Sequence, residues 1–182
     1  YVFTRLEFKG RNIVFILYLS TMMIPITVRL IPSYNLCRNL NMLDTYMGMI
    51  LPQVAWSIPF GTFLMRQFYM GIPKQLDEAA KIDGANHFQI FWKILLPNTK
   101  SSMTTLGIYT FISAWNNLIW MLLSVRSEGK WTVTLGISSI CGASVIKQPT
   151  WNLIMGVIVI GMIPVLILFF AFQKYFMQSV AA

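Results

Sequence analysis

The chain has 182 residues, of which 56% are hydrophobic and only 11% are charged, and its mean hydropathy is +0.62. About a quarter of the residues in an ordinary soluble domain are charged, so this composition excludes a typical soluble enzyme or binding module and favours a membrane protein. A soluble protein of this length also lacks the additional chain needed to cover several long apolar helices.

Four long apolar stretches predict four membrane-spanning helices. A bilayer core of about 30 Å requires roughly 20 apolar residues in a helix. The first stretch reaches that length if Arg29 extends its guanidinium to the membrane surface. We therefore expect an all-α integral membrane protein, a polytopic helical bundle that forms a single domain. The predicted spans are 12–31, 45–68, 101–124 and 151–172.

Proline and glycine occur at positions in two of these spans where they affect helix geometry. Pro25 removes a backbone donor inside the first span, and it marks either a bend in a moving helix or a static kink. Gly156 and Gly161 in the fourth span form a small-residue arrangement that allows close approach of another helix.

The net charge of +8 is distributed unevenly along the chain. Nine basic residues lie near the two ends or in the 66–100 loop, and five lie on the opposite side of the predicted spans. By the positive-inside rule, both ends and this loop face the cytoplasm, which explains the basic excess better than a nucleic-acid partner does. Cys37 and Cys141 then face outward, where packing roles are favoured over a disulfide because no spacing motif links them.

The 66–100 loop is the one long polar insertion, and its first part predicts a short helix. Pro73 suits the start of a helix, because its missing N–H has no partner there in any case. Asp77 and Glu78 follow in the opening turns, where the helix dipole favours negative charge. Gly84 can end the helix in a left-handed cap. One helix face then carries Ile72, Leu76, Ala79 and Ala80.

The second part of the loop predicts another short helix. Asn86 can cap it, in a capping box with Gln89 three residues later. Its apolar stripe consists of Phe88, Phe91, Trp92, Leu95 and Leu96. Such a stripe beside a membrane suits lipid headgroups, helices of the same chain or a partner protein, and periodicity does not choose among them.

The spacing of residues in this loop favours a partner protein as the contact of the apolar stripe. Glu78-Ala79-Ala80 is followed after three residues by Gly84, after nine more by Ile94, and after one more by Leu96-Pro97. This pattern resembles the cytoplasmic loop of ABC-importer permeases. The resemblance implies that residues 72–97 form a helix-turn-helix coupling loop docked on a separate ATPase subunit. The residues that it assigns to this contact are Glu78, Ala79, Ala80, Asp83, Gly84, Phe88, Phe91, Trp92, Ile94, Leu96 and Pro97.

Two other segments, Asn41–Tyr46 and Ser113–Trp120, are similar to the maltose-type, carbohydrate-uptake branch of these permeases. Asn117 departs from that branch, in which an acidic residue is common. Because amides and aromatic rings suit sugars, Trp115, Asn116 and Asn117 are candidates for the substrate pathway. The alternative is that the asparagines join neighbouring helices.

The resemblance also implies that the chain is part of a longer permease, with six spans, in a bacterial cell membrane. The implied partners are an ABC ATPase subunit, a second permease subunit, an extracytoplasmic solute-binding protein and a sugar. The alternatives are a permease for a peptide or a polyol, or a secondary transporter. The last is disfavoured because all six acidic residues lie outside the charge-free stretches.

The sequence shows no pattern that indicates an enzyme. His87 is the only histidine, and it has no metal-ligand partner at a suitable spacing. Around Lys130, the first glycine of a phosphate loop is missing and Trp131 replaces its serine or threonine. We therefore expect no catalytic residue, metal or cofactor in this chain, with ATP bound by the partner ATPase subunit.

Overall fold

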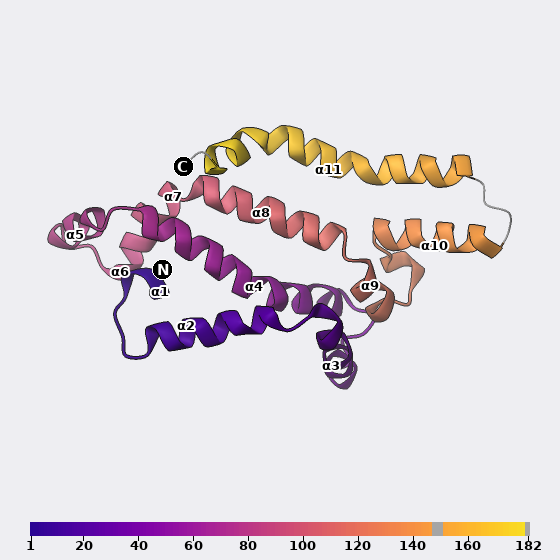
Figure 1. The fold of residues 1–182 in the computed structure, drawn as a ribbon, viewed down its shortest axis with the longest axis horizontal. Helices are drawn as coiled ribbons and strands as arrows, with labels where there is room; N and C mark the ends of the chain where they lie inside the picture. Colours follow the sequence, from indigo (N-terminus) through magenta and orange to yellow (C-terminus); the bar gives the residue numbers. More distant parts are fainter. Residues whose placement is uncertain (147–150, 181–182) are drawn as a thin grey trace. The chain divides into compact units, whose positions relative to one another are not determined.

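A computed structural model describes residues 1–146 and 151–180, which form helices joined by short turns (Figure 1). Among the described residues, two helices are long and apolar enough to cross a membrane: α4 (Tyr46–Gly71) and the Trp151–Gln173 part of α11 (Trp151–Val180). The pairs Arg11–Met23 with Ile26–Asn39 and Lys100–Trp115 with Leu118–Ser124 raise the number of candidate spans to four if each pair is one span. The predicted all-α fold is therefore confirmed.

Contacts divide the chain into two compact units, where the sequence predicts one domain. The first unit comprises Tyr1–Ile24, Trp56–Gly107 and the chain from Lys174, and the second comprises Pro25–Ala55 and Ile108–Gln173. The first unit contains α1 (Val2–Arg5), α2 (Arg11–Ser20), η1 (Thr21–Met23), α5 (Gln75–Ile82), α6 (His87–Gln89), η2 (Ile90–Leu95) and α7 (Leu96–Asn98). The second contains α3 (Ile26–Asn39), α9 (Leu118–Ser124), η3 (Glu128–Lys130) and α10 (Val133–Ile146), whereas α4, α8 (Lys100–Trp115) and α11 contribute to both.

The first predicted span, 12–31, is not a single helix. α2 passes into the 3₁₀ turn η1, and Ile24 is extended (φ −74°, ψ 116°) before α3 begins after Pro25. Proline lacks the N–H that would continue the helix, and it disfavours helical geometry at the residue before it. The helical backbone thus stops at the proline and starts again beyond it, continuing to Asn39 rather than to residue 31.

The third predicted span, 101–124, is broken at residues 116 and 117, where its two helices meet at 54°. Asn117 is the N-cap of α9, and its Oδ1 accepts a hydrogen bond from the backbone N–H of Trp120 at 3.3 Å. An asparagine in this position satisfies a helix N–H that has no partner within the helix. The local sequence therefore starts a new helix here.

Trp120, in the second unit, is among the largest fully buried side chains of the described residues. Its Nε1 donates a hydrogen bond of 3.0 Å to the carbonyl oxygen of Gly48, in the first turn of α4. The backbone of Gly48 lies close to that of Met42, since a Cβ at position 48 would be 2.0 Å from the Met42 carbonyl oxygen. The indole thus joins α9 to the start of α4.

The sequence analysis does not predict α10, an apolar helix of 14 residues that is too short to span a bilayer by itself. Gly161 of α11 lies against it, since a Cβ there would be 2.6 Å from Cδ1 of Ile137. Gly156 meets nothing within 4 Å among the described residues, so only one of the two glycines provides a close approach. Cys37 and Cys141 are both free thiols.

Candidate functional site

The 72–97 segment forms two short helices around a glycine turn. α5 carries Asp77 and Glu78 in its first turn, and Gly84 follows its end with a positive φ of +82°. The backbone N–H of Gly84 donates to Lys81 at 3.0 Å, and that of Ala85 donates to Ala80 at 2.9 Å. Glycine has no Cβ to oppose this left-handed conformation, so it closes the helix at little cost.

The second helix begins with a complete capping box. Asn86 Oδ1 accepts from the backbone N–H of Gln89, and Gln89 Oε1 accepts from that of Asn86, both at 2.9 Å. After α6 the helix widens into η2, a π-helix over Ile90–Leu95, before α7 completes it. Wide helical turns of this kind are rare and occur frequently at functional sites.

The inner side of the segment has its own apolar core. Ile90 and Leu95 are fully buried, and they cluster with Ala80 and with Tyr69 of α4. Burying an aliphatic side chain of this size stabilises a fold by about 1.5–3 kcal/mol. The helix pair is therefore held in place by its own chain. Partly buried residues complete the cluster: Tyr1, Met65, Ile72, Ala85, Phe91 and Ile94.

Three large apolar side chains of the segment are more than half exposed. Ile82 is 88% exposed, Phe88 71% and Trp92 52%. The rings of Phe88 and Trp92 are neighbours, with their centroids 6.0 Å apart. Ile82, Phe88 and Trp92, which we call the exposed apolar set, therefore present hydrophobic surface on both sides of the Gly84 turn.

The residues assigned to the ATPase contact divide by exposure. Ala80 is buried in the core, and Phe91, Ile94 and Leu96 are half-buried. The other seven are exposed: Glu78, Ala79, Asp83, Gly84, Phe88, Trp92 and Pro97. Ile82, the most exposed member of the apolar set, is missing from the predicted contact. Ile82 lies two residues after Ala80, about 200° around the helix from it. An apolar residue on the side opposite the buried stripe could have identified Ile82 from the sequence.

Asp77 lies in the first turn of α5, as the sequence predicts, but it has a partner that the sequence analysis did not identify. Its side chain is buried and lies 2.9 Å from that of Arg5, with Nε and Oδ2 in contact. The two residues are far apart in the sequence, so helix periodicity gave no indication of the pair.

The structure brings the candidate pathway residues together at the break between α8 and α9, with Trp115 and Asn117 half-buried and Asn116 exposed. The carbonyl of Trp115 accepts from Thr134 Oγ1 at 2.9 Å. Because Asn117 uses its side-chain oxygen to cap α9, a local structural role accounts for that residue.

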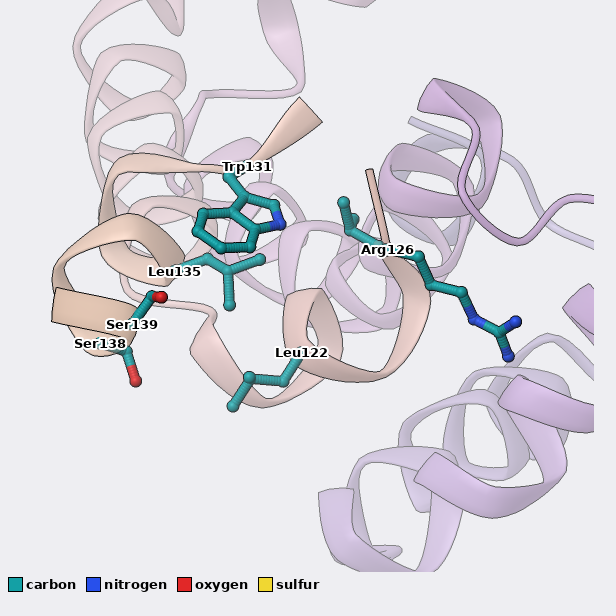
Figure 2. A pocket seen from close by; sticks show the side chains of 7 residues that line it. Leu122, Arg126, Trp131, Leu135, Ser138 and Ser139 are labelled. Atoms are coloured by element: carbon teal, nitrogen blue, oxygen red, sulfur yellow. The ribbon is translucent and has the colours of Figure 1, made fainter. Parts of the chain in front are cut away.

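The second unit contains a hollow of about 260 Å³ between α9 and α10. Figure 2 shows the Trp131 indole beside Leu135, whereas the Arg126 guanidinium points away from them. The lining is mainly apolar, and it comprises Leu122, Val125, Arg126, Trp131, Leu135, Ser138 and Ser139.

The loop beside this hollow is fastened by Asp44, which the sequence analysis did not select. Asp44 Oδ1 accepts from the backbone N–H groups of Arg126 and Ser127, both at 3.0 Å, and Oδ2 accepts from the Ser127 hydroxyl. Lys130 Nζ lies 3.6 Å from Oδ2. The hydrogen bonds from Ser127 and Arg126, with a smaller contribution from Lys130, hold the pKa of the Asp44 carboxyl well below its ordinary value.

Known proteins with similar sequences are transport permeases. Residues 2–182 match the family described as the binding-protein-dependent transport system inner membrane component. The sn-glycerol-3-phosphate transport system permease protein UgpE of Yersinia enterocolitica is 37% identical over 180 residues, which are 98% of this chain and 63% of that protein. The arabinooligosaccharides transport system permease protein AraQ of Bacillus subtilis is 35% identical over 173 residues, 95% of this chain and 60% of that protein.

A solved structure agrees with this relationship. It is the crystal structure of a bacterial ABC transporter involved in the import of the acidic polysaccharide alginate, and it matches with a TM-score of 0.80 and 27% identity over 96% of this chain and 65% of that one. The chain thus spans somewhat under two thirds of the length of these relatives. It is a multi-pass membrane protein and belongs to the family of binding-protein-dependent transport system inner membrane components.

Proposed function

We propose that this chain is the permease subunit of an ATP-driven importer and forms part of the translocation pathway for a sugar or oligosaccharide. The observation that carries the proposal is the 72–97 segment, which its own core holds in place while Ile82, Phe88 and Trp92 remain exposed. Membership of the family supports a separate ATPase subunit as the partner of this surface.

The proposed assembly contains two permease subunits, ABC ATPase subunits and an extracytoplasmic solute-binding protein. In this arrangement both ends of the chain and the 72–97 segment face the cytoplasm of a bacterial cell, in agreement with the excess of basic residues on that side. The chain has no catalytic role, and ATP is bound and hydrolysed by the partner ATPase subunit.

The interaction energies of the exposed side chains indicate which of them transmit the movement of the ATPase. Driving a two-state equilibrium from 1:99 to 99:1 requires about 5.5 kcal/mol of differential interaction. An exposed ion pair formed by Glu78 would contribute roughly 0–1 kcal/mol, whereas burying Phe88 or Trp92 in a partner groove would contribute about 1.5–3 kcal/mol each. The exposed apolar set therefore supplies the linkage, Glu78 orients it, and Gly84 permits the turn.

The relatives favour a carbohydrate over other solutes. One is named for arabinooligosaccharides, and the solved structure is described as importing a polysaccharide. A polyol derivative is the second candidate, because another relative is named for sn-glycerol-3-phosphate. Uptake assays with neutral oligosaccharides and with glycerol phosphate separate these two possibilities.

Cross-linking and transport together test the proposal. With Cys37 and Cys141 replaced, a cysteine at Phe88 or Trp92 should cross-link to the ATPase subunit in the intact assembly. A matched cysteine at Lys9, exposed outside the segment, should not. Membrane vesicles should take up radiolabelled oligosaccharide only when ATP is present inside. Uptake without ATP, or cross-links absent from both test positions, would contradict the proposed function.

A further inference from the structure

A buried ion pair fastens the 72–97 segment to the first helix of the chain. Arg5 Nε lies 2.9 Å from Asp77 Oδ2, and the two side chains are only 4% and 9% exposed. Two charges removed from water in this way are costly unless they face each other closely, and removing one of them leaves the other unpaired. The pair therefore holds α1 against α5.

Further contacts join α1 to the same segment. Arg5 Nη2 donates to the carbonyl oxygen of Ile72 at 2.8 Å. One guanidinium therefore contacts both Ile72, which precedes α5, and Asp77 in the first turn of α5. The Tyr1 hydroxyl lies 2.9 Å from Nδ1 of His87, and the Tyr1 ring packs on that of Phe91 with centroids 5.7 Å apart. In Figure 1, α1 lies beside α6.

On its other side, α1 contacts α2. The rings of Phe3 and Phe15 have their centroids 5.3 Å apart. Arg66 of α4 closes this contact, because its Cζ lies 4.5 Å from the Phe15 ring centroid and its Nε donates to the Phe3 carbonyl oxygen at 3.4 Å. α1 thus connects the 72–97 segment to α2, to which that segment has no direct chain connection.

The polar contacts of this junction are incomplete. Asp77 Oδ1, Thr4 Oγ1 and Arg5 Nε are all buried and have no hydrogen-bond partner among the described residues, so the 2.9 Å contact from Arg5 Nε to Asp77 Oδ2 is an ion pair without hydrogen-bond geometry. Most buried polar atoms in folded proteins do have a partner, so such exceptions call for an explanation. The residues of this junction thus hold one unused acceptor and two unused donors, which are free to form hydrogen bonds if the helices shift.

We propose that α1 is a positioning element that passes movement of the 72–97 segment to α2, with the Arg5–Asp77 ion pair as its joint. The inference rests on the proposed function, because it needs an ATPase that moves the segment. Through the chain itself, such movement reaches only α4 and α8. The ion pair adds the candidate membrane helix α2 to the elements that respond.

The test measures coupling in the intact assembly with both permease and ATPase subunits. Asp77→Asn and Arg5→Gln should each lower the solute imported per ATP hydrolysed by roughly tenfold, within the range that single positions on a coupling route produce. The exchange Arg5→Asp with Asp77→Arg should restore part of that ratio. A purely structural role would lower the amount of assembled complex but leave the ratio unchanged in what assembles.

Matched controls remove exposed charges nearby. Lys9→Gln and Lys74→Gln change lysines that are exposed, and both should keep the unaltered ratio. If Asp77→Asn fails to assemble, Arg5→Lys keeps the charge but loses the planar guanidinium fork, and it should give an intermediate ratio. An unchanged ratio in every variant that assembles would overturn the inference alone. Absence of ATP-dependent uptake in the unaltered protein would overturn the proposed function, and this inference with it.

Discussion

Substituting Gly84 isolates the contribution of backbone conformation to the 72–97 segment. Gly84 has a φ of +82°, and a Cβ built there meets nothing within 4 Å. Any effect of Gly84→Ala must then come from the left-handed backbone and not from a clash, and an L-residue in that region costs about 1–2 kcal/mol. If the turn must be formed for docking, the dissociation constant for the ATPase subunit should rise roughly five- to thirty-fold.

The identity of the new residue tests this explanation more sharply. Gly84→Asn should cost less than Gly84→Ala, because asparagine tolerates positive φ better than other L-residues. A β-branched residue, as in Gly84→Val, should cost the most. Gly71→Ala is the matched control, because Gly71 also has open space around its missing Cβ but lies in α4 without a positive φ.

The assay is titration of the detergent-solubilised permease with the ATPase subunit, together with amide hydrogen exchange across the turn. Exchange at residues near 84 should accelerate in the same order as affinity falls. Two outcomes would refute the reasoning: equal affinity for Gly84→Ala and the unaltered protein, or losses that follow side-chain volume in place of backbone preference.

Three further changes test the second unit. Trp120→Phe keeps the buried ring but leaves the Gly48 carbonyl without its donor, so the free energy of unfolding should fall by about 1–3 kcal/mol in a denaturant titration. Gly161→Leu should lower the melting temperature in detergent, since a Cβ alone would already lie 2.6 Å from Ile137. The pKa of Asp44 is lowered from 3.8, so the folded state gains stability from this carboxylate above pH 3.8 and loses it as the pH falls. The difference in melting temperature between the unaltered protein and Asp44→Asn should therefore keep its full value well above pH 3.8 and shrink as the pH is lowered below 3.8. A constant difference across that range would contradict the assignment.

Features that depend on a few consecutive residues were predictable from the sequence. The turn at Gly84 and the capping box of Asn86 with Gln89 each follow from residues no more than three or four positions apart. At Pro25 the sequence predicted only a bend or a kink within one span, whereas one helix stops before the proline and another begins after it. Hydropathy also identified the helices long enough to cross a membrane, since the bilayer thickness sets their length.

Features that depend on distant residues were not predictable in this way. Asp77 fits an exposed helix start by local rules, and only the presence of Arg5, brought close by the fold, makes it a buried partner. From the sequence, Asp44 is an ordinary loop residue. Only the fold brings the backbone N–H of Ser127 to its carboxylate. α10 escaped prediction for another reason, because a helix of 14 residues is shorter than the length by which spans are recognised.

We expect the two sides of the 72–97 segment to serve different purposes, and substitutions should separate them. Ile90 and Leu95 face the chain's own core, so truncating either removes buried contacts and lowers the amount of folded permease. Phe88 and Trp92 are 71% and 52% exposed, so their truncation removes fewer buried contacts and should lower the amount of folded permease less. The variants at Phe88 and Trp92 should mainly lose affinity for the ATPase subunit. The variants at Ile90 and Leu95 should mainly lose folded protein. This division is expected if the inner side packs on the chain's own core and the outer side binds the ATPase.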